Sequence, residues 1–138
     1  MDYKLVIAGW GCFNYFKSKP RKDWVVLFDS PNHNDLMSLM ADIDIAVQLM
    51  RYNFGESSGI VPMLLSLNKN VIVSKLGSFL DFGNAVEYVA ADASIEEIAH
   101  VISNVVNNDS NYKEIQIKEY VLSHSVQEFT YRLRKLVV

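Results

Sequence analysis

One short polar turn in this chain has the residue types of an anion-binding site. The turn runs from Gly55 to Gly59 with the sequence GESSG, between a predicted strand and the start of a predicted helix. The first N–H groups of a helix lack intrahelical partners, and together with the helix dipole they attract phosphate or carboxylate. The glycines let the backbone approach a ligand, and the serines can donate hydroxyl hydrogen bonds. Arg51, just upstream, can add a bidentate contact to phosphate oxygens.

Glu56 is the exceptional residue of this turn. Its negative charge repels a phosphate group unless the carboxylate faces a hydroxyl group or a cation instead. Two interpretations stay open. Glu56 either contacts a hydroxyl-bearing part of a ligand, or it only stabilises the start of the helix together with the serines, because Glu and Ser are both favoured there.

Two other turns carry weaker signals. Gly9-Trp10-Gly11 follows an apolar run and is half of a dinucleotide-binding fingerprint, since the third glycine is missing. Asp29 is the acidic residue at the end of the second apolar run, where dinucleotide-binding proteins hold a ribose, and Ser30 follows it. These turns predict a nucleotide contact only if the fold brings them together with the Glu56 turn.

Length, charge and composition exclude several classes of function. The chain has 138 residues, enough for one domain, and its net charge of −3 gives no reason to expect binding to nucleic acid or to an anionic membrane. We interpret the single cysteine, Cys12, as a small buried side chain in a reducing compartment. No run is typical of a signal peptide or a membrane span, so we expect a cytoplasmic protein. None of the histidines has metal-ligand spacing, so we expect structural or solvent-exposed roles for His33, His100 and His124.

Apolar runs alternate with helical spacings along the chain. The sequence predicts strands at 3–8, 24–28, 45–50, 71–74 and 86–90, with helices between them and two closing helices divided near 123–125. Ser94 with Glu97, and Ser125 with Glu128, have the spacing of capping boxes. This alternation predicts an α/β fold with a Rossmann-like parallel sheet flanked by helices. Ligands bind at the carboxyl ends of such strands, so we expect all three turns to meet in one crevice.

The same residues resemble a known family. From Leu5 to its C-terminus the chain is similar to the donor-binding, C-terminal domain of GT-B glycosyltransferases, in particular bacterial retaining enzymes of the family-4 type (glycosyl transferases group 1). The most specific match is the central segment, because members commonly have an Arg, a Gly-Glu-Ser/Thr-Ser-Gly turn, a Leu-rich helix, Gly-Lys-Pro and a Val/Ile strand. The matching segments are LVIAGWG, VVLFDS, DLMSLMADIDIAVQL, LMRYNFGESSGIVPMLLSLNKNVIVSKLGSF and KEYVLSHSVQEFTYRLRKLV.

Carried over residue by residue, the resemblance implies a role for each turn. It implies that Glu56 is the catalytic residue beside the transferred sugar and that Arg51 lies close to the donor diphosphate. The other donor-binding residues implied for the diphosphate and the nucleotide are Ser57, Ser58, Gly59, Gly9, Trp10, Gly11, Asp29 and Ser30.

The chain also departs from the family pattern. Met63 or Leu64 stands where the family has a second Glu that holds the nucleotide ribose, and Asn68-Lys69-Asn70 replaces Gly-Lys-Pro. The first strand and the basic Arg and Lys-Gly elements of a complete donor domain have no counterpart here. We therefore expect residues 1–110 to form the nucleotide-sugar-binding core, residues 111–138 to close the same domain, and an N-terminal acceptor domain to be missing from this sequence.

The resemblance implies a retaining glycosyltransferase that transfers a hexose from a nucleotide sugar to a saccharide or lipid-linked acceptor, in surface polysaccharide biosynthesis. No cofactor or metal is expected, because helix N–H groups and Arg51 can neutralise the diphosphate. We expect the fragment alone to be inactive and the complete enzyme to lie in the cytoplasm, peripheral to the inner face of the membrane. The alternative is a non-catalytic nucleotide-sugar-binding or interaction module.

The closing helices carry more apolar residues than a peripheral helix on a small domain needs. We expect a contiguous apolar patch there, covered by the acceptor domain in the complete enzyme or by a weak homodimer in the fragment. The residues concerned are Tyr120, Val121, Phe129, Leu133 and Leu136.

Overall fold

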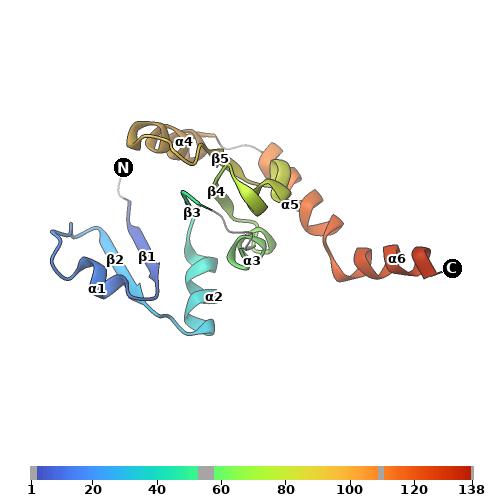
Figure 1. Cartoon of the computed structure of the whole chain (residues 1–138), viewed down its shortest axis with the longest axis horizontal. Coiled ribbons are helices and arrows are strands. Elements are labelled where there is room, and N and C mark those ends of the chain that lie inside the picture. Colours follow the sequence, from blue (N-terminus) through green and yellow to red (C-terminus); the bar gives the residue numbers. More distant parts are fainter. Residues whose placement is uncertain (1–2, 53–57, 109–110, 138) are drawn as a thin grey trace. The chain divides into compact units, whose positions relative to one another are not determined.

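Parallel strands alternate with helices, as the sequence predicts, in the computed structural model of the chain (Figure 1). The structure describes residues 3–52, 58–108 and 111–137. By their contacts the residues divide into two compact units, unit 1 (residues 1–42) and unit 2 (residues 43–138). The elements are β1 (Leu5–Gly9), α1 (Cys12–Phe16), β2 (Val25–Asp29), α2 (His33–Asp42), β3 (Ile45–Gln48), α3 (Ile60–Ser66), β4 (Asn70–Ser74), the 3₁₀ segment η1 (Gly77–Ala85), β5 (Glu87–Val89), α4 (Ile95–Asn107), α5 (Asn111–Ser123) and α6 (Val126–Val137).

Unit 1 is a β-α-β arrangement followed by α2. Strands β1 and β2 pair in parallel, with Leu5 opposite Val25 and Gly9 opposite Asp29. The crossover between them carries the short helix α1, which ends well before Pro20. Gly11 precedes α1 at φ 77°, a left-handed conformation that favours glycine, so the Gly-Trp-Gly turn is a steric requirement of this connection.

Unit 2 is built around β4. Strands β3, β4 and β5 form a parallel sheet with β4 at its centre, and the side chains from Val71 to Ser74 are all buried. Helix α3 packs against this strand with the face of Val61, Leu64 and Leu65 buried. Each such buried aliphatic side chain stabilises the fold by about 1.5–3 kcal/mol.

Helix α3 ends where the family pattern and this sequence differ. Asn68 takes a left-handed conformation at φ 56°, and the amides of Asn68 and Lys69 donate to the carbonyls of Leu65 (2.9 Å) and Leu64 (3.0 Å). Glycine is the usual residue at such a helix end, and asparagine is the side chain that tolerates it best. Asn68 therefore makes at this helix end the turn that a glycine usually makes.

The ladders make two sheets within the described residues, β1-β2 in unit 1 and β3-β4-β5 in unit 2, where the sequence predicted one. Within each sheet the pairing strands follow one another along the chain, so the crossover between them holds them together locally. The two sheets would join only if a strand of unit 1 paired with a strand of unit 2, and no such ladder is present among the described residues. The structure thus shows an α/β fold of small parallel sheets alternating with helices.

Segment η1 is an element that the sequence analysis did not predict. It places Phe79, Phe82 and Ala85 in the core of unit 2, and the Phe82 ring meets the Tyr120 ring of α5 at 5.6 Å between centroids. Gly83, at φ 53° and ψ −130°, interrupts the segment, so Phe79 and Phe82 precede this kink and Ala85 follows it. Helix α5 packs on η1 and α3 and buries Ile117.

The two predicted capping boxes have different outcomes. At α4 both bonds form: Ser94 N–H donates to Glu97 Oε2 (2.7 Å), and Glu97 N–H donates to Ser94 Oγ (3.2 Å). At α6 Glu128 N–H donates to Ser125 Oγ (3.2 Å), but Ser125 N–H donates to the Leu122 carbonyl (3.3 Å). The second box is therefore half formed, because the last turn of α5 already uses the amide that the box needs.

Candidate functional site

The segment that follows β3 is attached to the neighbouring strand. Ser74, the last residue of β4, is 1% exposed, and its Oγ accepts a 2.7 Å hydrogen bond from Met50 N–H. This bond fixes the chain as it leaves the carboxyl end of β3. Ser74 is thus a positioning residue for the turn that follows, and the sequence analysis missed it because a serine inside an apolar strand gives no hint of its partner.

The start of α3 is attached to the end of β3. Ser58 Oγ donates to Gln48 Oε1 (2.8 Å) and accepts a longer hydrogen bond from Val61 N–H (3.4 Å). The chain therefore leaves the carboxyl end of β3 and returns to it before α3 begins. Because the hydroxyl proton of Ser58 is used on Gln48, this residue can offer an anion its backbone N–H rather than its hydroxyl group.

Gly59 leaves the start of α3 open. Its backbone, at φ −70° and ψ −22°, is one that any residue adopts, and a Cβ at this position would meet no atom within 4 Å. Glycine is therefore not required here by strain or by packing. What it provides is uncovered backbone at the first turn of the helix.

The other predicted site residues near this turn fall into those that the structure describes and those that it does not. Arg51 is exposed on the segment between β3 and the turn. Gly55, Glu56 and Ser57 lie outside the described residues, so the roles predicted for Glu56 and Ser57 stay predictions. The described part of the site consists of Arg51, Ser58 and Gly59, with Gln48 and Ser74 as their supports.

Unit 1 brings the other two predicted turns together. Gly9 lies opposite Asp29 in the ladder, and Ser30 N–H donates to the Gly9 carbonyl (3.1 Å) while Ser30 itself stands at φ 50°. Trp10 is 91% exposed beside them. Five predicted donor-binding residues thus share the carboxyl end of one β-α-β arrangement. The crevice that would join them to the Ser58 turn of unit 2 stays a prediction.

Asp29 has an unsatisfied atom at this strand end. Its Oδ1 is buried and has no hydrogen-bond partner among the described residues. Cys12 is a free, buried thiol, as predicted, and burial raises its pKa above the ordinary 9.0, followed by the hydrogen bond to Asp29 and the negative charge of that carboxylate. The thiol is therefore protonated at neutral pH and a poor nucleophile.

The histidines lie apart from these strand ends. His100 contacts Asn104 on the exposed side of α4, and the His124 ring stacks on Tyr120 at 4.0 Å between centroids. His33 is the exposed first residue of α2. In the part of the chain that the structure describes, no group of three or more His, Cys, Asp or Glu residues is placed to hold a metal ion.

Two hollows on the described surface of unit 2 lie away from Arg51, Ser58 and Gly59. One, of about 250 Å³, opens at the amino ends of β4 and β5 between Asn70 and Glu87. Lys113 closes one side of it, with its Nζ 2.8 Å from Glu87 Oε1 and 2.9 Å from the Asn84 carbonyl. The other, of about 430 Å³, lies between β5 and the first half of α4. Both belong to the packing of α4 and α5.

Comparison of the chain with models of protein families, with curated proteins and with solved structures finds no match. Over the described ranges 3–52, 58–108 and 111–137, no helix has both the length and the apolar character that crossing a bilayer requires. Function must therefore be inferred from the residues of the chain and their geometry.

Proposed function

We propose that this chain is the nucleotide-sugar-binding domain of a retaining GT-B glycosyltransferase, and that the complete enzyme transfers a hexose to a saccharide or lipid-linked acceptor in surface polysaccharide biosynthesis. The observation that carries the proposal is the pair of attachments around the GESSG turn. Met50 is bound to Ser74, and Ser58 is bound to Gln48, so the described residues on both sides of the turn are attached at the carboxyl end of a parallel strand. That is the edge at which α/β sheets bind ligands.

The proposal includes a division of roles. Backbone N–H groups of Ser57, Ser58 and Gly59 and the guanidinium of Arg51 hold the donor diphosphate, and Glu56 lies beside the sugar. Such groups orient the donor and stabilise the departing diphosphate, which is expected to supply much of the rate enhancement. The uncovered backbone at Gly59 and the free exposure of Arg51 support this division.

The nucleotide end of the donor is assigned to unit 1. Leu64 is 2% exposed in the core of unit 2, so its position cannot hold a ribose, and Met63 carries no hydroxyl-binding group. The proposal therefore assigns the ribose contact to the carboxylate of Asp29, which lies beside Gly9, Trp10, Gly11 and Ser30. The proposal requires that the two parallel sheets join into one Rossmann-like sheet, as the sequence predicts, with the acceptor domain supplied by sequence outside this chain.

Binding of UDP, GDP and ADP, measured by titration calorimetry, tests the proposal directly. Without an acceptor domain to close over it, a nucleoside diphosphate is expected to bind in the millimolar to high-micromolar range, about 4–6 kcal/mol. Arg51→Gln should weaken this binding, whereas Arg21→Gln, an exposed arginine in unit 1 away from the predicted turns, should not. Failure of all three nucleotides to bind, or equal binding by the two variants, contradicts the proposal.

The alternative, a non-catalytic nucleotide-sugar-binding module, is favoured by one observation. The position of the family's second carboxylate is occupied by apolar residues, and Leu64 there is part of the core. This module would bind the nucleotide sugar without transferring it. Turnover by the full-length protein separates the two functions.

A further inference from the structure

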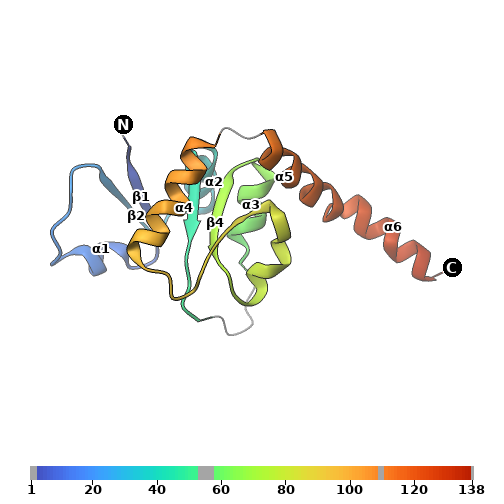
Figure 2. The same cartoon turned by 90° about the horizontal axis from the view of Figure 1, so that it is seen from above.

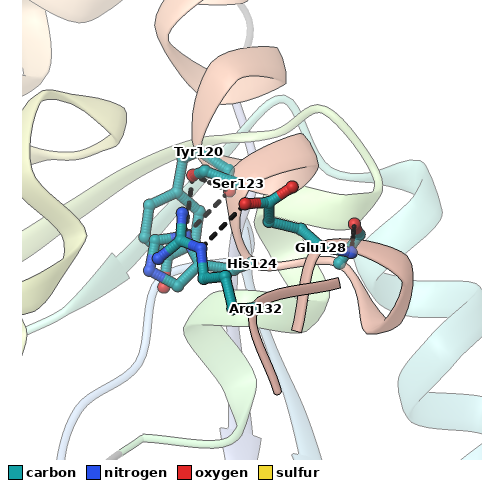
Figure 3. Close-up of polar contacts among 6 residues, drawn as sticks. Tyr120, Ser123, His124, Glu128 and Arg132 are labelled. Carbon is teal, nitrogen blue, oxygen red and sulfur yellow. Dashed lines mark hydrogen bonds and ion pairs between the residues drawn. The ribbon is translucent and has the colours of Figure 1, made fainter. Parts of the chain in front are cut away.

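Helix α6 is a well-formed helix that receives little support from the rest of unit 2. Ser125 caps its first turn, and Arg132 Nε donates to Glu128 Oε1 (2.8 Å) one turn along (Figure 3). Arg134 and Lys135 stand in its last turn, where they complement the helix dipole. Figures 1 and 2 both show α6 running away from the β3-β4-β5 sheet of its own unit. The described hydrogen bonds and ion pair of α6 are thus local, and among the described residues of unit 2 its side chains Val126, Phe129 and Leu133 are exposed.

The apolar residues of α6 form a single exposed stripe. Val126, Phe129 and Leu133 follow one another at spacings of three and four residues, and they are 77%, 63% and 44% exposed. Residues at these spacings lie on the same side of a helix. Because exposed apolar side chains rarely gather in this way on a protein surface without a binding role, the stripe marks an interaction surface.

The charges around the stripe indicate its partner. Arg132 and Arg134 stand immediately before and after Leu133, so at about 100° per residue they border the stripe on its two sides. Lys135 lies over the Tyr131 ring on the opposite side of the helix, 4.4 Å from the ring centroid. The one acidic side chain of α6, Glu128, is already paired with Arg132.

We propose that α6 binds the surface of a bilayer containing anionic phospholipid. The stripe of Val126, Phe129 and Leu133 enters the boundary between headgroups and acyl chains, and Arg132 and Arg134 reach the phosphates from its borders. An apolar face bordered by cations on a helix of low overall hydrophobicity is the pattern of an interfacial helix. A second copy of this chain fits less well, because it would bring two sets of the same arginines together.

The inference rests on α6 alone, and it replaces the expectation that an acceptor domain or a second copy covers Phe129 and Leu133. It would place the catalytic domain where a lipid-linked acceptor is found. The experiment that tests it measures vesicle binding and not glycosyl transfer.

Vesicle flotation of the purified chain tests this inference. Large vesicles of phosphatidylcholine with phosphatidylglycerol should carry the protein, whereas vesicles of phosphatidylcholine alone should not. Binding should be lost near 1 M salt, where the screening length is about 3 Å. Equal flotation with both kinds of vesicle, or no flotation with either, overturns the proposal.

Variants locate the binding surface. Arg134→Glu should weaken partitioning by roughly tenfold or more, because a basic residue near an anionic surface contributes a factor of about five and the substitution also adds a repelled negative charge. Phe129→Ser should weaken partitioning by a similar factor, because it removes the largest apolar side chain from the stripe. Arg21→Glu and Ile95→Ser are the matched controls, since both residues are exposed and neither lies on α6. All four substitutions are at exposed positions, so the fold should tolerate them.

Light scattering over a concentration series completes the test. A chain that stays monomeric and floats with anionic vesicles supports the proposal. A dimer that Phe129→Ser dissociates, with no vesicle binding, would show that a second copy covers the stripe and would overturn it. Unchanged flotation of Arg134→Glu would also overturn it, because the charge argument would then be wrong.

Discussion

The carboxyl ends of β3 and of β2 differ in how their polar side chains are satisfied. At the end of β3, Ser58 is bound to Gln48 and to Val61, and Ser74 is bound to Met50. At the end of β2, Asp29 Oδ1 is buried and has no hydrogen-bond partner within the described ranges. At the end of β3 the polar side chains are used in hydrogen bonds that hold the following segment in place. A buried carboxylate oxygen without a hydrogen bond costs free energy. Its presence at a strand end therefore needs an explanation, such as a ligand that it contacts.

The largest effect we expect is at the turn that the β3 end supports. In the full-length protein, Glu56→Gln should lower turnover by about a hundredfold, which corresponds to roughly 2.7 kcal/mol, and leave the free energy of unfolding within about 1 kcal/mol of the parent. Glu96→Gln, an exposed glutamate in the first turn of α4, is the control. Unaltered turnover, measured with the natural donor, would return Glu56 to the role of a helix cap.

The next effect concerns the buried support itself. Ser74→Ala should lower the free energy of unfolding by about 1–3 kcal/mol, because it leaves Met50 N–H without its acceptor. Ser66→Ala, whose exposed hydroxyl donates to the Met63 carbonyl, should cost less than about 0.5 kcal/mol. Urea denaturation of both variants measures the difference. Equal costs would mean that the β3 end is no better supported than the surface.

A smaller effect is expected where the turn meets α3. Ser58→Ala removes the hydrogen bond to Gln48 and the acceptor for Val61 N–H, so it should cost about 1 kcal/mol in urea denaturation. If Ser58 serves as a support and offers only its backbone to a ligand, nucleotide affinity should change by less than the loss of Arg51 produces. A larger loss of affinity than in Arg51→Gln would show that the hydroxyl group itself binds the ligand.

The smallest expected effect concerns Asp29 at the end of β2 and the pKa of the neighbouring Cys12 thiol. Asp29 raises the pKa of Cys12, so Asp29→Asn should lower that pKa and speed alkylation of the thiol by a few-fold at a fixed pH. Since the folded-state pKa of Cys12 lies above the ordinary 9.0, the stability linked to this group is present below pH 9 and declines as the pH rises further. The pH profile of iodoacetamide labelling measures both. Identical profiles for parent and variant would show that Asp29 does not act on the thiol.

The sequence predicted the strands closely because each is an apolar run bounded by residues that break it. The end of β1 at Gly9 and the cap of α4 at Ser94 and Glu97 were readable for the same reason, since both depend on neighbours within four residues. The supports at Gln48 and Ser74 were not readable. Their partners, Ser58 and Met50, lie ten and twenty-four residues away, and only the parallel ladder brings them together.

Two further differences have the same origin. The prediction of a full capping box at Ser125 was wrong, because the Ser125 amide has a competing acceptor in Leu122 that spacing alone does not show. The sheet was predicted as one, whereas the described ladders stop between unit 1 and unit 2. Local sequence patterns therefore predicted the helices and strands of this chain. The tertiary structure was needed to show which polar side chains bind another part of the chain and which do not.

The position of the aromatic residues gives the chain a built-in optical reporter. Its two tryptophans, Trp10 and Trp24, both belong to unit 1. Trp10 is almost fully solvated beside Gly9 and Gly11, while Trp24 makes an edge contact with Tyr3 at 5.1 Å between ring centroids. Intrinsic fluorescence therefore follows unit 1 alone, whereas circular dichroism, dominated by the longer helices, follows unit 2. Recording both signals during one denaturation shows whether the two units melt together, and quenching of Trp10 emission would report occupancy of its turn.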